Sequence, residues 1–421
     1  MLTALSTRSN IPLALSSRLT CIRRSLTGTP QASPKGTLTD DALATKRRGK
    51  NLLSGLGKRP IEVILHKAFP VESSQSGRSL ITGLRYLASY DFIDEKHIVV
   101  PGSPRIWNPP AVPFQISPDT RELVAGPKEY KFISASFEPL FAAIDAMETS
   151  MDWPSIDIIT NRRALRQLYR WIDRGNPTQQ DHFRIDFEVI GKNTILFDEV
   201  WTEFRFKEVP LYGAGFALET TDAGPGCEKS KGHHRIVQYT FSGLKLVVRS
   251  ETDARIGSPF SSPDPPPKPA KPTKHSPYIV RAGEVVPQDA IVEIKTMNGY
   301  KNPDYSHQTW PHFKWGFVAE QVLLSGASHL CTGIHAEGDF YVVEDHAVDQ
   351  KALLAGHPRV DANMRKLARL LRHLRSTVLK HARKGERLSV VYLDGRLWVY
   401  ERGSKRRSIL ATVFARGYPE T

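Results

Sequence analysis

The sequence is poor in cysteine and contains no long apolar run. Its 421 residues include three cysteines, Cys21, Cys227 and Cys331, whose number is odd and whose spacing matches no metal-ligand pattern. They exclude a disulfide framework and indicate a reducing compartment. No stretch approaches the roughly 18 consecutive apolar residues of a membrane-spanning helix, so we expect no membrane span.

Acidic residues are missing from the start of the chain. Residues 1–34 contain no Asp or Glu, and residues 1–60 hold eleven Lys and Arg against two acids, which gives +9 of the formal charge of +14. Arginines spaced among apolar and hydroxyl residues are typical of a mitochondrial transit peptide. The basic run 46–50 serves equally well as a nuclear signal. We expect residues 1–60 to be a disordered basic segment and the protein to act in the mitochondrion or the nucleus, with the acid-free pattern favouring the mitochondrion.

Residues 61–421 have the composition of a globular domain, since 40% of the whole sequence is apolar. Apolar spacing predicts helices over 137–147, 162–171, 313–324 and 363–382. Apolar runs and alternation predict strands over 156–160, 183–190, 194–198, 244–253, 291–296, 388–393 and 396–401. We therefore expect an α+β protein, with mixed central β-sheets flanked by helices in a single large domain.

Two features of this domain are interpreted as structural. Asp186 and Glu188 alternate with apolar residues, so we expect them on the polar outer face of an antiparallel strand. Residues 257–277 contain eight prolines, which cannot donate hydrogen bonds to a sheet. This stretch is predicted to be an exposed insertion at the tip of a hairpin.

The stretch 291–296 places a carboxylate and an ammonium two residues apart in an apolar run. Because side chains in a strand alternate between faces, Glu293 and Lys295 project from one side and the flanking apolar residues from the other. Buried charges of this kind are costly unless they are paired or bind a metal. The pair is therefore either part of a site or a cross-strand ion pair on a solvated face.

A second same-face pair, Glu251 and Asp253, ends the predicted strand 244–253. If the two strands are neighbours, these acids converge with Glu293 and Lys295. Carboxylates at such close range repel one another, and a hard divalent cation relieves that repulsion. The lysine suits a phosphate substrate, because it can orient the attacking water or neutralise developing charge.

Three more polar residues could join this cluster. Arg162 begins a predicted helix, where it contacts either a phosphate or only solvent. Glu219 lies four residues after Gly215, in a Gly-x-Gly-led helix that could look down onto the sheet. Gln321 interrupts an apolar stripe and needs a partner, either backbone or something bound.

In combination and in order, these motifs resemble the decapping exoribonuclease (DXO) family, a branch of the PD-(D/E)XK nuclease-like folds. The likeness covers about residues 85–402. The matching stretches are Arg162 after Asp157-Ile158-Ile159-Thr160, Gly215-Phe216-Ala217-Leu218-Glu219, Glu251-Thr252-Asp253, Glu293-Ile294-Lys295-Thr296 and Gln321. Departures are Thr252 at a usually apolar position, a tryptophan displaced to Trp315 and the long proline insertion, and they bear on substrate preference more than on the metal site.

The resemblance implies an enzyme that removes incomplete or unconventional 5′ caps, including NAD, from RNA and then degrades the RNA from its 5′ end. It implies two divalent cations, Mg²⁺ or Mn²⁺, and a 5′–3′ exoribonuclease as a candidate protein partner. The implied roles are metal binding for Glu219, Asp253, Glu293 and, through water, Glu251; catalysis for Lys295, Gln321 and Glu251; and substrate binding for Arg162 and Lys314.

Two other functions stay open. The same fold class hosts DNA nucleases, since fold does not fix function. A non-catalytic RNA-binding or partner-activating protein is the third alternative. The retained carboxylates and Lys295 argue against it, because a scaffold gains nothing from a repulsive cluster of acids.

Overall fold

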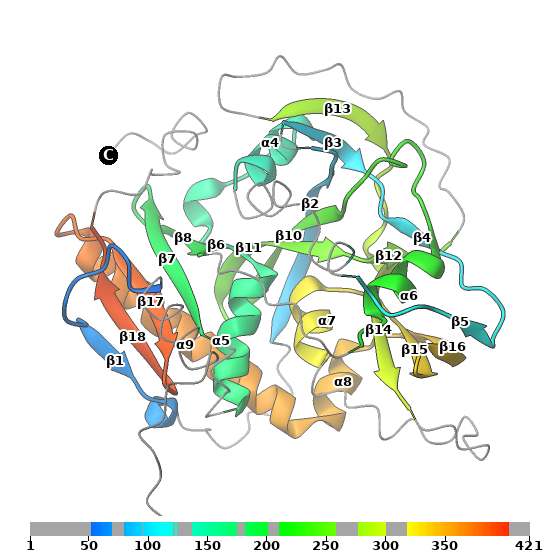
Figure 1. Ribbon diagram of the computed structural model, residues 1–421. Helices are drawn as coiled ribbons and strands as arrows, with labels where there is room; N and C mark the ends of the chain where they lie inside the picture. The colour runs from blue at the N-terminus through cyan, green and yellow to red at the C-terminus, as the bar shows by residue number, and fades with distance from the viewer. Residues whose placement is uncertain are drawn as a thin grey trace, which may run out of the picture. The chain divides into compact units, whose positions relative to one another are not determined.

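The computed structural model describes residues 52–69, 80–94, 96–120, 123, 137–174, 182–200, 210–257, 277–299 and 318–403. Residues 1–51 of the predicted disordered segment 1–60 lie outside these residues, as do Lys314, Trp315 and most of the proline-rich stretch. Residues 52–60 are described, and Leu52 is buried, so the prediction of disorder is wrong for this part. The described part is built on two β-sheets with helices packed against them (Figure 1).

The larger sheet has eleven strands within the described residues. In spatial order they are β1 (Glu62–Ile64), β18 (Arg396–Glu401), β17 (Leu388–Leu393), β7 (Phe183–Ile190), β8 (Thr194–Glu199), β6 (Ile158–Asn161), β11 (Leu244–Thr252), β10 (His233–Phe241), β2 (Ile81–Phe92), β3 (His97–Gly102) and β13 (Tyr278–Gly283).

The second sheet has seven strands within the same residues. In spatial order they are β5 (Phe114–Gln115), β16 (Asp339–Ala347), β15 (His329–Ala336), β14 (Ile291–Asn298), β12 (Ala254–Arg255), β4 (Arg105–Trp107) and β9 (Thr221–Asp222). Both sheets mix parallel and antiparallel pairs, as in β11–β6 and β10–β11 of the larger one.

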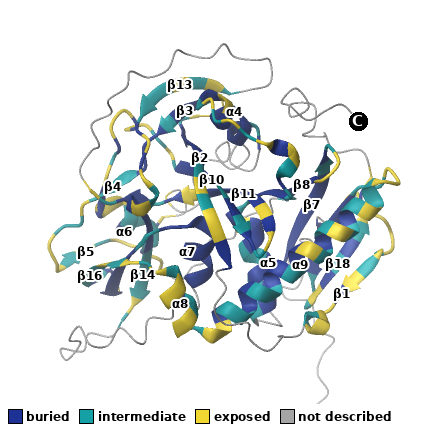
Figure 2. Ribbon diagram, turned by 180° about the vertical axis from the view of Figure 1, so that it is seen from behind, coloured by how far each residue is buried: buried dark blue, intermediate teal, exposed yellow. Residues whose placement is uncertain are grey.

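Helices cover both faces of the larger sheet. The α-helices are α4 (Glu138–Ala146), α5 (Arg162–Arg174), α6 (Gly213–Glu219), α7 (Ala319–Ser325), α8 (Gln350–Gly356) and α9 (Pro358–Ala382). Neighbouring residues of β11 point to opposite faces: Val248 packs in the core formed with α5, α7 and α9, and Val247 in the core formed with α4. The central part of the sheet is therefore buried on both sides, as the dark blue of β7, β8 and β11 in Figure 2 shows, while the edge strands β1 and β13 are more exposed.

The two sheets are joined where β11 runs into β12. Asp253 is the one residue between these strands, so the chain passes from the larger sheet to the second one at this position. β12 then pairs antiparallel with β14, with Ala254 opposite Val292. Continuing this register by one residue brings Asp253 beside Glu293. The two charged strands are therefore not neighbours within one sheet, since β11 and β14 belong to different sheets. The acids at the end of β11 approach β14 through β12 instead.

Most of the predicted elements lie where the sequence places them. α4, α5, α9 and the hairpins β7–β8 and β17–β18 match the expected segments to within a few residues, although α9 begins five residues earlier. The described part of the predicted helix 313–324 is α7. The expected α+β class with mixed sheets is confirmed. Among the described residues no helix is both long and apolar enough to cross a membrane.

The structure corrects the interpretation of Asp186 and Glu188. Both are buried, with only 1% and 5% of their surface exposed, and they do not form a solvated outer face. Asp186 accepts a hydrogen bond from Nε of Arg184 at 2.5 Å, and Arg402 lies 3.3 Å from Glu188. Residues from the two ends of the described chain cover this face, since Arg184 also donates to the backbone oxygen of Leu52.

The proline-rich stretch does not connect a simple hairpin. β12 and β14 are antiparallel neighbours, as a hairpin requires, but β13 lies between them in sequence and pairs with β3 at the edge of the larger sheet. The chain therefore leaves the second sheet and returns to it. Residues 258–276, which hold nearly all of the predicted insertion, are outside the described residues.

Candidate active site

Glu293, on β14, is the centre of a buried group of charges. Only 2% of its surface is exposed. Its Oε2 accepts a hydrogen bond from Nη1 of Arg162 at 2.5 Å, and its Oε1 accepts one from Nζ of Lys295 at 2.7 Å. Lys295 and Glu293 are two residues apart on one strand, so their contact confirms the predicted shared face. Arg162 comes from the first residue of α5, which follows β6 directly.

Asp253 faces this pair from the junction between the sheets. Its Oδ2 accepts a hydrogen bond from the backbone N–H of Ile294 at 2.8 Å, which fixes the carboxylate against β14. The same oxygen lies 4.0 Å from Nζ of Lys295. About a quarter of the Asp253 side chain is exposed, so one part of the carboxylate is held by protein and another part reaches solvent.

Glu251 completes the cluster from the end of β11. Its side chain is exposed to solvent in a pocket. The surrounding protein atoms, together with the negative charges of Asp253 and Glu293, raise the pKa of Glu251 to about 7. Burial and the charge of Glu293 likewise raise the pKa of Asp253. Burial is the largest cause of both shifts, and the neighbouring carboxylates add to it.

The two cations act mainly on Glu293. Burial alone would raise its pKa, but the charges and hydrogen bonds of Arg162 and Lys295 outweigh burial and lower the pKa of Glu293. Burial would also lower the pKa of the Arg162 guanidinium, and the charges of Glu293 and Asp253 more than offset that effect. Glu293 is therefore ionised at neutral pH, and Arg162 stays charged beside it.

The donor set suits a hard divalent cation. Glu251, Asp253 and Glu293 supply carboxylate oxygens, which are the ligands that Mg²⁺, Mn²⁺ and Ca²⁺ prefer. Neighbouring carboxylates add to burial in raising the pKa of Glu251 and Asp253, so a cation at this place would relieve their repulsion. As they stand, no three of the described His, Cys, Asp and Glu side chains are placed so that they could hold a metal ion. Because Arg162 and Lys295 occupy both oxygens of Glu293, binding a cation requires one of these contacts to loosen.

The other predicted site residues are placed differently. Glu219 is the last residue of α6 and is exposed, and no described residue makes a hydrogen bond or ion pair with its carboxylate. Its role as a metal ligand stays a prediction. Gln321 is buried on α7, which packs against α5, the helix that begins with Arg162. Lys314 lies outside the described residues.

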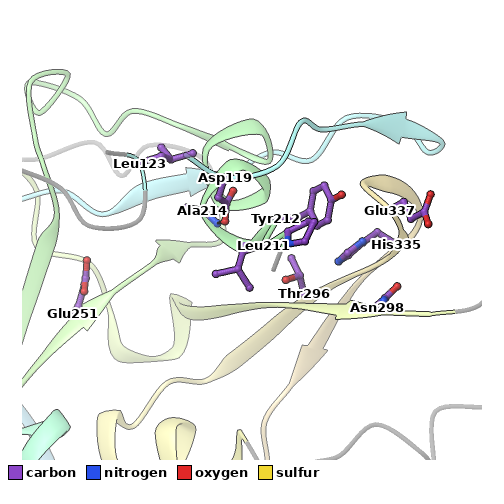
Figure 3. A pocket seen from close by; sticks show the side chains of 12 residues that line it. Asp119, Leu123, Leu211, Tyr212, Ala214, Glu251, Thr296, Asn298, His335 and Glu337 are labelled. Atoms are coloured by element: carbon purple, nitrogen blue, oxygen red, sulfur yellow. Dashed lines mark hydrogen bonds between the residues drawn. The ribbon is translucent and has the colours of Figure 1, made fainter. Parts of the chain in front are cut away.

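A pocket of about 780 Å³ opens beside the charged cluster. Glu251 lies on one side of it, and Tyr212 and His335 lie on the other (Figure 3). The rings of Tyr212 and His335 are 4.7 Å apart between centroids. Burial lowers the pKa of His335, so its ring is neutral at pH 7. The pocket thus combines aromatic rings with a carboxylate of the cluster.

The wall of this pocket depends on Asp119. Its two carboxylate oxygens accept hydrogen bonds from the backbone N–H groups of Gly215 and Ala214 at 2.8 and 3.0 Å, which fixes the first turn of α6. Sequence reasoning missed Asp119, Tyr212 and His335. The weak Gly-x-Gly signal after Tyr212 was the one local hint of a site, whereas Asp119 and His335 belong to no motif.

A family model described as a domain of unknown function, DUF8563, matches residues 59–412. The chain belongs to the DUF8563 family. No curated protein matches its sequence. The matched range contains the whole charged cluster and the pocket, so the site is part of the DUF8563 domain.

Solved structures of Rai1 share the fold of this DUF8563 chain. S. pombe Rai1 in complex with 3′-FADP superposes with a TM-score of 0.53 at 13% identity, covering 81% of this chain and 99% of that one. Scheffersomyces stipitis Rai1 in complex with (3′-NADP)⁺ and calcium ion gives 0.51 at 13% identity, over 83% and 96%. Candida albicans Rai1 in complex with pU5-Mn²⁺ gives 0.50 at 12% identity, over 83% and 96%. The family resemblance is therefore confirmed at the level of the fold.

Proposed function

We propose that this DUF8563 protein is a metal-dependent phosphodiester hydrolase that acts on the 5′ ends of RNA. It removes incomplete or non-canonical caps, NAD caps among them, and degrades RNA in the 5′–3′ direction. The observation that carries the proposal is the convergence of Glu251, Asp253 and Glu293 with Lys295 and Arg162 beside an open pocket. Three carboxylates with two cations are the parts that phosphoryl transfer needs.

The Rai1 structures support this choice of substrate. They hold a dinucleotide in two cases, with calcium in one of them, and pU5-Mn²⁺ in the third. In the DUF8563 chain Glu251, Asp253 and Glu293 would hold the divalent cations, with Glu219 as a further ligand that remains a prediction. When bound, such a cation polarises the scissile phosphate and neutralises the developing charge.

The residues of the chain supply positioning and charge. Lys295 donates through Nζ to Glu293 and to the backbone oxygen of Ile294, so its ammonium is held at the edge of the cluster, where it can orient water or a phosphate oxygen. Arg162 provides a permanent positive charge on the other side of Glu293. The pocket between Glu251 and Tyr212 would hold the 5′-terminal nucleotide.

The test compares wild type with Asp253→Asn, and with Asp345→Asn as a control that makes the same chemical change on β16 of the second sheet. Linear RNAs with NAD, triphosphate and monophosphate 5′ ends are incubated with Mg²⁺ or Mn²⁺. We expect Asp253→Asn to lower turnover at least about a hundredfold, because it removes a cation ligand, while its melting temperature and the control's activity stay near wild type. Digestion by Asp253→Asn at the wild-type rate would show that the cluster is not catalytic.

Three further arms separate the alternatives. A circular RNA should resist the enzyme while the linear RNA of the same sequence is degraded, and efficient nicking of the circle would replace 5′-end hydrolysis by general nuclease activity. Equal degradation of single-stranded DNA would favour a DNA nuclease, because the 2′-hydroxyl distinguishes the two substrates.

Calorimetric titration with Mn²⁺ should show binding that Asp253→Ala/Glu293→Ala abolishes. RNA binding without Mn²⁺ binding or cleavage would indicate the non-catalytic protein.

A further inference from the structure

A second groove, away from the candidate active site, is lined by cations. This groove, called the α9 groove below, has a volume of about 430 Å³ and lies where α9 meets the start of β11. It is lined by the cations Arg372, Arg375, Lys380 and Arg383 and by Leu244, Ser376 and Leu379. None of its lining residues is acidic. Its electrostatic character is therefore opposite to that of the candidate active site.

The cations of the α9 groove are arranged by the helix. The positions 372, 375, 379 and 380 follow one another at helical spacing, so they share one face of α9. Arg383 caps the helix in a helical conformation and continues this face. From the first to the last, this face extends about 16 Å at 1.5 Å per residue. The opposite face of α9 packs in the core through Leu371, Leu374 and Val378. Figure 2 shows the resulting division of α9 into buried and exposed sides.

Three of the four cations have no counter-charge within the described residues. Arg372, Lys380 and Arg383 are exposed, and no described acid forms an ion pair with them. Arg372 donates a hydrogen bond to the backbone oxygen of Ser242, which directs its guanidinium along the protein surface without neutralising it. The α9 groove thus concentrates three unneutralised positive charges around a concave surface, an arrangement that attracts a polyanion.

The fourth cation, Arg375, is held rigidly. It lies 2.8 Å from a carboxylate oxygen of Asp157 and donates to the backbone oxygen of Asn193 at 3.1 Å. Its Nε is buried and has no hydrogen-bond partner among the described residues. The positive charge of Arg375 is therefore neutralised by Asp157, while its Nε makes no hydrogen bond with a described residue.

We propose that the α9 groove binds the phosphate backbone of a single RNA strand. The choice of RNA rests on the proposed function. Cations at intervals along about 16 Å match a chain of repeated phosphates, and the partly exposed Leu379 offers an apolar surface for a ribose or base between them. The α9 groove and the active site lie at opposite ends of one strand, because Leu244 begins β11 and Glu251 is seven residues further on, about 23 Å at 3.3 Å per residue.

Binding is tested with Arg372→Ala/Lys380→Ala/Arg383→Ala, since alanine keeps α9 helical. The matched control is Lys67→Ala/Lys231→Ala/Lys351→Ala, which removes the same charge from exposed positions elsewhere. The probe is a fluorescent 20-nucleotide RNA, measured in EDTA so that no cleavage occurs. We expect the groove variant to lose at least tenfold in affinity. The slope of log K against log salt should become shallower by about 2, at about 0.7 for each of three contacts with a single strand.

A cleavage assay locates the effect along the substrate. With Mg²⁺ present, the groove variant should raise KM for the 20-nucleotide RNA several-fold and leave kcat/KM for a four-nucleotide RNA unchanged, because the short RNA is bound at the active site alone. Equal losses for both lengths would place the defect in the active site and overturn the proposal. If no form of the protein cleaves RNA, the proposed function fails, and the binding assay alone decides the α9 groove.

The remaining outcomes of the binding assay are decisive. An unchanged RNA affinity, or an equal loss in the control variant, would overturn the proposal. A poly-glutamate peptide provides the comparison with an acidic protein segment. If the groove variant loses affinity for that peptide and keeps its affinity for RNA, the α9 groove is a protein-docking surface and the proposal is wrong.

Discussion

Arg162 and Glu293 are 131 residues apart in the sequence, yet Nη1 of the arginine lies 2.5 Å from Oε2 of the glutamate. Both residues are buried. An ion pair in such a setting contributes little compared with an apolar pair, but it is costly to break by removing one partner. Because Lys295 also contacts Glu293, the carboxylate keeps one cation when Arg162 is replaced.

This relationship predicts strong coupling in a double-mutant cycle. Arg162→Met should lower the free energy of unfolding by about 1–3 kcal/mol, because it leaves the buried carboxylate with a single cation. The double variant Arg162→Met/Glu293→Gln should lose clearly less unfolding free energy than the two single variants lose together. Urea denaturation of the four proteins measures the coupling energy. Additive effects would show that the two side chains do not interact in solution.

The buried Asp186 predicts an acid-dependent loss of stability. Burial would raise its pKa, but hydrogen bonds and charges from Arg184 and Arg402 outweigh burial and lower the pKa of Asp186. A carboxyl group whose pKa falls on folding stabilises the protein above its unfolded pKa of about 4, and this contribution disappears as the pH falls through the folded pKa. Asp186→Asn should therefore lower the free energy of unfolding by about 2 kcal/mol at pH 7.

The difference between wild type and Asp186→Asn should be constant from pH 7 to about pH 5 and shrink below about pH 4. Urea denaturation across this range measures it. Asp222→Asn is the control, since Asp222 is exposed and accepts a hydrogen bond from the exposed side chain of Asn108 at 2.7 Å. This substitution should change the free energy of unfolding by less than about 1 kcal/mol. A difference for Asp186→Asn that grows towards low pH would contradict the sign of the pKa shift.

The cap on α6 predicts a loss of local order. Asp119→Ala leaves the backbone N–H groups of Ala214 and Gly215 without their carboxylate partner, which costs about 1 kcal/mol for a helix cap. Asp119→Asn keeps one acceptor oxygen, so one of the two N–H groups loses its partner, and the free energy of unfolding should fall by less than in the alanine variant. Hydrogen exchange at residues 213–219 should quicken most in the alanine variant and less in the asparagine variant. Equal exchange in both would mean that the cap does not hold α6.

Close packing under α6 predicts that Gly333 cannot be replaced. A Cβ at this position of β15 would lie 2.3 Å from Cε2 of Phe216, on α6, and 2.8 Å from Cε1 of Phe340. Gly333→Ala should lower the free energy of unfolding by about 1–3 kcal/mol, because the added methyl group overpacks the core. Gly356→Ala is the control, because no atom lies within 4 Å of its added Cβ. Equal melting temperatures for the two variants would show that Phe216 moves aside freely.

Local patterns were sufficient to predict the elements that form the candidate site. The period of 2 in 244–253 and 291–296 gave the strands and placed Glu293 and Lys295 on one face, and the structure joins them at 2.7 Å. Their approach to Asp253 was expected from the two strands being neighbours, which the sequence suggested only through the shared chemistry of the acids. The strands lie in different sheets, and the register of β12 with β14 supplies that contact.

Features that depend on distant segments were not predictable in this way. Alternation in β7 suggested a solvated face for Asp186, but Arg402, some 216 positions later in the sequence, and the backbone around Leu52 cover it. The pocket wall is another case, because Asp119 reaches α6 across about 95 residues. A single sequence carries no signal for which segment will cover a polar face, since that choice is made by tertiary packing.

Asp253 connects the two sheets both through its backbone and through its side chain. Its backbone follows the last residue of β11 in the larger sheet, and its carboxylate accepts a hydrogen bond from the N–H of Ile294 in the second sheet. A ligand that binds Asp253 and Glu293 together would therefore tie the two sheets to each other. Its binding should slow hydrogen exchange along β11 and along β14 at the same time, although the two strands belong to different sheets.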